Sequence, residues 1–234
     1  MSGRLYGLGV GPGDPELLTL KALRILQRCG LIAFPTLEDG ASFARAIVAA
    51  HVLPTQRELP IRLPMTTERA PAQAVYDLAA EEIAAALAAG TDVAVLCEGD
   101  PFFYGSFMYL FGRLAERHPV EVVPGVSSLT ACAAATGFPL AARNDVLTVL
   151  PAPLDDDRLR RGLAGCDAAA IIKLGRHLPR IRRLLAEEGL LEQACYVERA
   201  SLPNERRVPL AALEDAPAPY FSMILLHRRG SAWR

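Results

Sequence analysis

The sequence predicts an α/β protein with two domains, each built on a sheet covered by helices. Three segments support this, and they begin at Leu5, Val93 and Val120. Each contains a short apolar strand, then a turn rich in Gly, Pro and Asp or Ser, then a helix. Strands that alternate with helices at this spacing are typical of a largely parallel sheet.

The turns in the first half carry helix-start signals. Asp14 and Asp100 occupy positions where an N-cap side chain accepts from free backbone N–H groups, and a proline follows each of them. Gly90 is the stop signal of a longer helix. The expected elements are a strand at Leu5–Val10, a helix from Glu16 to about Arg28, a strand ending at Phe34-Pro35-Thr36, a helix from about Pro71 to Ala89, a strand at Val93–Cys97, an aromatic helix through Leu114, a strand at Val120–Val123 and an Ala-rich helix.

Strands outnumber helices in the second half, which predicts a mixed sheet. The expected strands are Val146–Leu150, Ala168–Leu174, Ala194–Glu198, Glu205–Val208 and Tyr220–Leu226, with helices at Asp155–Leu163 and about Leu178–Glu188. The composition shifts near residues 143–157, and we place the boundary between Phe138 and Asn144, which gives domains at residues 1–140 and 141–234.

Composition excludes several classes of protein. The net charge is -1, from 25 basic and 26 acidic residues, which argues against a nucleic-acid binder that uses a broad basic surface. The five cysteines form no CxxC pair and the four histidines no metal-ligand spacing, so no metal site is expected and a reducing cytoplasm fits. The N-terminus is not typical of a signal peptide, and no apolar tract is long enough for a membrane helix.

The first turn, Gly7-Leu8-Gly9-Val10-Gly11-Pro12-Gly13, is not a dinucleotide fingerprint. A GxGxxG that starts at Gly7 has Pro12 in place of the third glycine, and one that starts at Gly9 has Asp14 there. Pro12 removes a backbone N–H donor and Asp14 adds a carboxylate, and both changes disfavour the binding of a diphosphate. The glycines still allow a ligand to approach the backbone closely, although a purely structural turn explains them equally well.

Ligands of open α/β sheets bind beyond the carboxyl ends of the strands, where all three turns are expected. Asp14, Glu98 and Asp100 bring carboxylates to these turns. Acidic groups with exposed backbone donors and acceptors suit a ligand with positive charge, an amino-acid part and a nucleoside part. S-adenosylmethionine has all three.

Three stretches carry a family resemblance: LYGLGVGPGDPELLTLKA (5–22), EGDPFFYGSF (98–107) and VPGVSS (123–128). In order and spacing they resemble the successive signatures of the tetrapyrrole methylase family, and the likeness extends over nearly the whole chain. The resemblance implies two α/β domains with the active site in the cleft between them, S-adenosylmethionine as cofactor, a tetrapyrrole substrate, a cytoplasmic location and a homodimer.

Site residues follow from the resemblance. It implies that the cofactor is bound by Pro12, Glu98, Gly99, Asp100, Phe103, Ser127, Ser128, Leu174 and Ala200. Methylation of an electron-rich ring carbon needs little acid–base chemistry, and Glu98, Tyr104 or water are the candidate bases. A substrate rich in carboxylates should meet arginines. The candidates are Arg45, Arg62, Arg143 and Arg176, each of which is also readily explained as a solvated surface charge.

Within the family, the segment from Gly99 to Leu110 and the Phe34-Pro35-Thr36 segment resemble enzymes that methylate C20 of precorrin-2, giving precorrin-3A in cobalamin biosynthesis. Pro35 stands roughly where uroporphyrinogen III methylases have an aspartate, which disfavours that earlier step. The alternatives are another ring position, the cobalt-bound substrate, or a non-catalytic S-adenosylmethionine-binding protein. A nicotinamide-dependent oxidoreductase lacks its GxGxxG and its ribose-binding acid.

Overall fold

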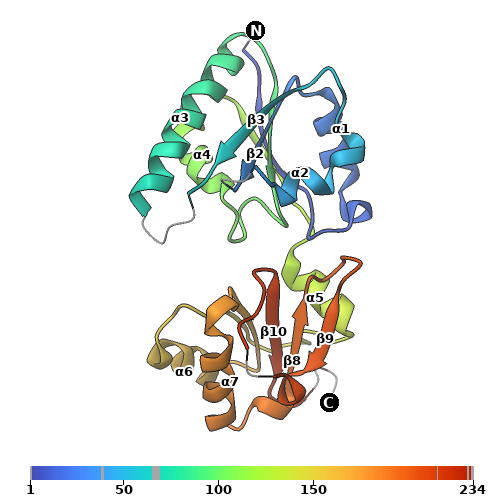
Figure 1. Cartoon of the computed structure of the whole chain (residues 1–234), viewed down its shortest axis with the longest axis vertical. Helices are drawn as coiled ribbons and strands as arrows, with labels where there is room; N and C mark the ends of the chain where they lie inside the picture. The colour runs from blue at the N-terminus through green and yellow to red at the C-terminus, as the bar shows by residue number, and fades with distance from the viewer. Residues whose placement is uncertain (1, 38–39, 65–68, 215, 231, 233–234) are drawn as a thin grey trace. The chain divides into compact units, whose positions relative to one another are not determined.

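The computed structural model describes residues 2–37, 40–64, 69–214, 216–230 and 232. The chain divides into two compact units, Met1–Ser127 and Ser128–Arg234. Each unit has a five-stranded sheet with helices on both faces, so the predicted α/β class and the pair of sheets are confirmed (Figure 1).

The first unit has a fully parallel sheet with the strand order β3-β2-β4-β1-β5. Its strands are β1 (Leu5–Gly9), β2 (Leu31–Thr36), β3 (Arg57–Arg62), β4 (Val93–Cys97) and β5 (Val120–Val123). Its helices are α1 (Leu20–Arg28), α2 (Phe43–Ile47), α3 (Arg69–Ala88) and α4 (Phe107–Leu114), with short 3-10 turns η1 (Pro15–Leu17) and η2 (Ala49–His51).

The two faces of this sheet are buried in separate apolar clusters. Leu8 of β1 packs with Ile25 and Leu26 of α1, in the cluster that also includes residues of α2. On the opposite face, Ile83 of α3 and Phe107 of α4 pack over the sheet. Burial on both faces explains why β1 and β4 are continuously buried strands and not alternating ones.

The second unit has the predicted mixed sheet, with strand order β6-β7-β10-β8-β9. The pair β6–β7 is parallel and the other three pairs are antiparallel. Its strands are β6 (Leu147–Pro151), β7 (Ala168–Ile172), β8 (Ala194–Glu198), β9 (Arg206–Pro209) and β10 (Ser222–His227). Its helices are α5 (Ser128–Thr136), α6 (Asp156–Ala164) and α7 (Leu178–Glu187), with 3-10 turns η3 (Gly175–His177), η4 (Leu191–Gln193) and η5 (Leu210–Ala212).

Helix α5 belongs to the second unit. Its Cys132 is buried with Ala170 of β7, Val197 of β8 and Leu225 of β10. The other face of the sheet is covered by α6 and α7. The units therefore divide between Ser127 and Ser128, earlier in the chain than the boundary near residue 140 that the sequence predicts.

Three predicted bounds are wrong for identifiable reasons. The first helix does not start at Glu16, because the chain is extended at Leu18 and Thr19 caps α1 by accepting from the N–H of Ala22 at 3.1 Å. The aromatic helix does not start after Pro101, because residues 101–106 form a closed turn. Strand β7 ends at Ile172 and not at 174, because the next residue has a left-handed backbone with φ 59°.

Candidate functional site

The three glycine-containing turns lie together at one edge of the first sheet. Strand β1 is paired with β4 on one side and with β5 on the other, and all three are parallel. Gly9 is in register with Cys97, and Leu8 with Val123, so the chain leaves the three strands at nearly the same level. The predicted gathering of these turns at the carboxyl edge is confirmed.

The backbones of the three turns are in contact. Gly99 N–H donates to the carbonyl of Gly11 at 2.8 Å, and Gly11 N–H returns a longer bond of 3.4 Å. A Cβ added to Gly125 would lie 2.1 Å from the carbonyl oxygen of Gly99, and one added to Gly9 would lie 2.5 Å from the nitrogen of Gly125. Only glycine allows this approach, and the first two turns are further fixed by the Gly11–Gly99 bridge.

Asp100 joins the second turn to the third. Its Oδ1 accepts from the N–H groups of Phe102 at 2.9 Å and Phe103 at 3.1 Å, as an N-cap would. Its Oδ2 accepts from the N–H of Gly125 at 3.1 Å. The carboxylate therefore accepts hydrogen bonds from three backbone N–H groups that belong to two different turns. Asp14 plays the same local role in the first turn, where its Oδ1 accepts from the N–H of Glu16 at 2.8 Å.

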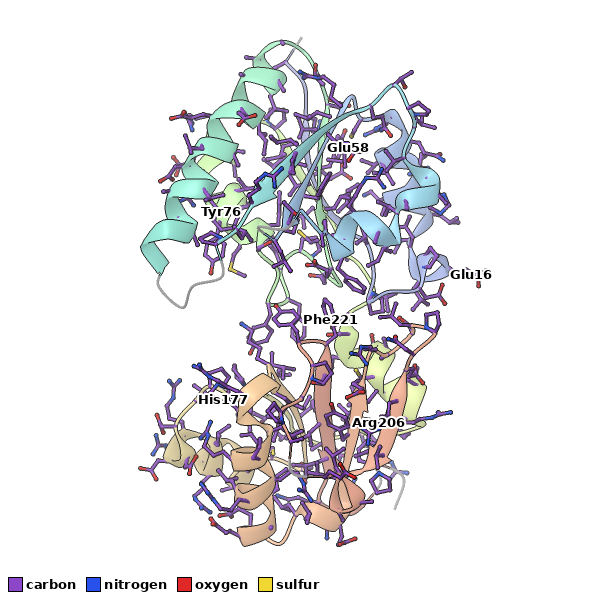
Figure 2. The ribbon with its side chains drawn as sticks, viewed as in Figure 1. Glu16, Glu58, Tyr76, His177, Arg206 and Phe221 are labelled. Atoms are coloured by element: carbon purple, nitrogen blue, oxygen red, sulfur yellow. The ribbon has the colours of Figure 1, made fainter. Side chains whose placement is uncertain are left out.

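Glu98 is half-buried at the end of β4. Burial raises the pKa of its carboxyl group, while hydrogen bonds from its own N–H and that of Ala44 oppose the increase. The phenol of Tyr76, which lies on α3 (Figure 2), is hydrogen-bonded to the Ser106 side chain, and its pKa is raised by burial and, more weakly, by groups that include Glu98. Glu98 is thus a carboxyl group with an increased affinity for a proton.

Three exposed aromatic side chains follow in the second turn, and the first of them is Phe102. Phe103 is 37% exposed and Tyr104 is 46% exposed, and their rings meet edge to face with centroids 5.2 Å apart. Tyr104 has φ 57°, which is unusual for a bulky residue. The turn closes so tightly that a Cβ on Gly105 would lie 2.5 Å from the carbonyl oxygen of Pro101. The closed backbone therefore holds both rings toward solvent.

The expected cofactor residues are divided between the two units. Pro12, Glu98, Gly99, Asp100, Phe103 and Ser127 lie in the first unit, and Ser128, Leu174 and Ala200 lie in the second. In the first unit, five of these six lie in the two turns that the Gly11–Gly99 bridge connects, and the sixth follows Gly125 in the third turn.

In the second unit the side chains of Leu174 and Ala200 point into apolar cores. Leu174 is fully buried beside α7, and Ala200 is 7% exposed in the cluster that includes α5. A cofactor at these positions would therefore meet mainly main-chain atoms. The preceding residues, Lys173 and Arg199, both have left-handed backbones, with φ 59° and 52°. Strained residues of this kind are concentrated at functional sites.

The four candidate substrate arginines differ in their surroundings. The Arg45 guanidinium is already paired with Glu58 of β3, with Nη2 to Oε1 at 2.8 Å and Nε to Oε2 at 3.1 Å (Figure 2). Arg62, Arg143 and Arg176 are exposed. Arg45 is consequently a weaker candidate, because a substrate carboxylate would have to compete with Glu58.

Some structurally important residues of the site had no recognisable sequence signal. Tyr76 stacks on Tyr109 of α4 with centroids 5.0 Å apart, and it lies 22 residues before Glu98 in the chain. Glu198, the last residue of β8, is a buried carboxylate two residues before the expected cofactor residue Ala200, and no motif singled it out.

Two further properties bear on the type of site. Within the described ranges, no three or more His, Cys, Asp or Glu side chains are grouped so as to hold a metal ion. Among the helices that the structure describes, none is both long and apolar enough to cross a membrane.

The first unit thus gathers three glycine-containing turns at the carboxyl edge of a parallel sheet, and its first turn is not a dinucleotide fingerprint. A model of the Tetrapyrrole (Corrin/Porphyrin) Methylases matches residues 4–215, and the chain belongs to this family. The family assignment predicted from the three signature stretches is therefore confirmed.

Individual relatives narrow the comparison. The chain is 46% identical to a precorrin-2 C(20)-methyltransferase of Sinorhizobium sp over 96% of this chain and 95% of the relative. It is 32% identical to a cobalt-precorrin-2 C(20)-methyltransferase of Salmonella typhimurium over 98% of each chain. A crystal structure of uroporphyrin-III C-methyl transferase from Thermus thermophilus, complexed with S-adenyl homocysteine, matches with TM-score 0.70 and 26% identity over 96% of this chain and 92% of that one.

Proposed function

We propose that this protein is an S-adenosylmethionine-dependent C-methyltransferase that methylates C20 of precorrin-2, giving precorrin-3A in cobalamin biosynthesis. The observation that carries the proposal is the 46% identity to a precorrin-2 C(20)-methyltransferase over 96% of the chain. The Sinorhizobium relative is named for precorrin-2 and the Salmonella relative, at 32% identity, for its cobalt complex. The difference in identity favours the metal-free ring as substrate.

The chemistry of the described residues fits the cofactor. S-adenosylmethionine supplies a methyl group on a positively charged sulfur, which is a good leaving group. Glu98 offers a half-buried carboxyl group to such a charge, and Phe103 offers an exposed ring in the turn that follows. Pro12 and Gly99 present a backbone whose conformation the Gly11–Gly99 bridge fixes. Asp100 acts through the backbone, since its carboxylate accepts from three N–H groups.

In the second unit, Leu174 and Ala200 would contribute main-chain contacts, because their side chains are buried in apolar cores. Ser127 and Ser128 would contribute from the third turn. The proposed role of all these residues is orientation. Holding two reactants in line can contribute about 7–11 kcal/mol to lowering a barrier, and it requires rigid turns rather than reactive side chains.

A proton must leave C20 after methylation. Glu98 is the preferred acceptor, because burial raises the pKa of its carboxyl group and a stronger base takes the proton more readily. Tyr104 is the second candidate, with its phenol presented to solvent by the closed turn. Arg62, Arg143 and Arg176 are proposed to meet substrate carboxylates, ahead of the already paired Arg45. A homodimer and a cytoplasmic location complete the proposal, on family likeness.

The experiment has two steps. Calorimetric titration with S-adenosylhomocysteine tests the cofactor site. Incubation with S-adenosylmethionine and either precorrin-2 or its cobalt complex, at equal concentrations, tests the substrate by product mass, and NMR locates the new methyl group. We expect binding, a gain of one methyl at C20, and faster turnover of the metal-free ring.

Other outcomes separate the alternatives. Methylation at another carbon would assign a different step of the same family, and faster reaction of the cobalt complex would reverse the choice of substrate. Binding of S-adenosylhomocysteine without methyl transfer to either ring would support a non-catalytic binding protein. Absence of binding would refute the proposed function as a whole.

A further inference from the structure

Strand β8 ends in a buried carboxylate. The Glu198 side chain is only 10% exposed, and its backbone lies between Ser222 of β10 and Arg206 of β9 in the sheet register. The positions of Arg206 and of Phe221, which precedes β10, are labelled in Figure 2. A charged group at such a site is costly unless its oxygens have partners.

Both carboxylate oxygens of Glu198 have partners. Oε2 accepts a short hydrogen bond from the phenol of Tyr196, whose ring is 1% exposed in the core beneath. Oε1 lies 3.6 Å from Nη1 of Arg199. Burial and the neighbouring carboxylate both raise the pKa of the Tyr196 phenol, so the phenol stays protonated and remains a donor. The side chain of Ser222 is a further hydrogen-bond partner of this phenol.

The chain that leaves Glu198 is a strained loop. Arg199 and Ser201 have left-handed backbones, with φ 52° and 68°. Two tight turns follow, since Leu202 N–H donates to the carbonyl of Arg199 and Glu205 N–H to that of Leu202, both at 3.0 Å. Non-glycine residues adopt such conformations only where the surroundings impose them. The surroundings here are the partners of Glu198 at the start of the loop and a second carboxylate at its end.

Glu205 supplies that second carboxylate. Its Oε2 accepts from the N–H of Ser201 at 2.9 Å. Residues 199–205 are therefore held between Glu198 and Glu205, with Ala200 buried between the two left-handed residues. Ala200 is the position that the proposed function places against the cofactor.

Stability alone does not account for Glu198. Replacing a buried charged group and its partners by apolar side chains is often neutral or stabilising, so stability does not explain the contacts of Glu198, whereas a role in fixing one loop conformation would use all of them. We propose that Glu198, together with Tyr196, is a positioning residue that holds the 199–205 loop, and with it the backbone of Ala200, in the conformation that accepts the cofactor. This inference rests on the proposed function.

The same sheet provides a matched control. The side chain of Asp145 is 7% exposed and forms hydrogen-bonded ion pairs with His227 and Arg229. His227 is the last residue of β10, and Ser222, beside Glu198, is the first. Glu198→Gln and Asp145→Asn each remove one buried negative charge from one end of the sheet. Only the first of these changes lies beside the 199–205 loop.

The test compares Glu198→Gln, Tyr196→Phe and Asp145→Asn with the wild-type protein. For Glu198→Gln we expect the Kd of S-adenosylhomocysteine and the KM of S-adenosylmethionine to rise about tenfold with kcat within twofold, a change of about 1.4 kcal/mol. Tyr196→Phe should give a smaller change in the same direction. Asp145→Asn should lower the melting temperature without changing either constant.

Hydrogen–deuterium exchange provides a readout of the loop itself. In Glu198→Gln the amides of Ser201, Leu202 and Glu205 should exchange faster than in the wild type, whereas Asp145→Asn should leave them unchanged. If Glu198→Gln does not fold, Tyr196→Phe decides the question by the same measurements. Unchanged cofactor constants in a folded variant, or equal changes in the Asp145→Asn control, would overturn the inference while leaving methyl transfer by the wild type intact.

Discussion

Substitution of Gly125 by alanine tests whether contact between the turns organises the site. The new Cβ would lie 2.1 Å from the carbonyl oxygen of Gly99 and 2.8 Å from the Cα of Gly9. Both neighbours are backbone, so no side chain can rotate away. Real Cβ contacts are essentially never below 3.0 Å, so the second and third turns must separate by about 1 Å.

The magnitude follows from that displacement. Overpacking of this kind lowers the free energy of unfolding by about 1–3 kcal/mol. A loss of about 2 kcal/mol, the middle of that range, lowers the melting temperature by about 4–8 °C for a chain of this size. The effect on activity should be greater, because a misplacement of about 1 Å in a site that works by orientation costs on the order of a hundredfold in rate. We expect Gly125→Ala to lower kcat/KM by about that factor while the protein still folds.

Steady-state methyl transfer and thermal unfolding measure the two effects on one preparation. Gly112→Ala is the matched control, because Gly112 lies in α4 with no atom within 4 Å of an added Cβ. An exposed glycine within a helix should gain about 0.5–1 kcal/mol of stability on this change, with activity unaffected. A Gly125→Ala variant with kcat/KM within twofold of the wild type would refute the reasoning.

Four further variants address three carboxylates. Asp100→Ala should lower the free energy of unfolding, measured in urea, by about 2 kcal/mol, because three backbone donors lose their acceptor. Asp100→Asn should lower it less, and equal losses in the two variants would contradict this role of Asp100. Glu98→Gln should lower kcat by about 10²–10⁴ and abolish the rise of kcat with pH if Glu98 is the base, whereas an increase only in the KM of S-adenosylmethionine would show a binding role. Hydrogen bonds from Ala142 N–H, Arg229 and His227 lower the pKa of Asp145 to about 2, so its contribution to stability is present above pH 4 and lost as the pH falls toward 2. In Asp145→Asn, the free energy of unfolding should therefore fall less between pH 4 and pH 2 than in the wild type. An unchanged pH dependence would contradict this role of Asp145.

Apolar patterning predicted the elements that are buried on both faces. Strand β8 has the expected bounds, Ala194–Glu198, and α7 ends one residue before the expected end. Strand β3, Arg57–Arg62, was not predicted, because its sequence RELPIR contains a proline and is mostly exposed at the edge of the sheet. What makes this segment a strand is its pairing with β2, and such pairing cannot be recognised from the local sequence.

The start of α1 shows a second limit. Asp14 and Pro15 are a sound N-terminal signal, and they do start a helical turn. That turn is three residues long, because Thr19 provides a competing cap and the chain between the two caps is extended. Two caps five residues apart are compatible with one helix or with two, and tertiary packing decides between them.

The site was predictable as a set of turns but not as a set of contacts. Parallel pairing of β4, β1 and β5 follows from the repeated strand–turn–helix pattern. The contact between Gly9 and Gly125 depends on the register of β1 against β5, which the sequence does not state. The glycines of β1 also serve packing, since a Cβ on Gly7 would lie 2.4 Å from the ring of Phe107. Close approach of a ligand is therefore not needed to explain Gly7 or Gly9.

The same geometry changes the electrostatic argument for the cofactor. Three carboxylates near the turns appear from the sequence to form an acidic site for a cation. Asp14 and Asp100 instead accept from backbone N–H groups, which hold the turns in place. Glu98 is partly exposed, and burial raises the pKa of its carboxyl group. In the proposed function, Glu98 is therefore the one of the three carboxylates left to face a sulfonium group, whereas Asp14 and Asp100 fix the backbone of the turns.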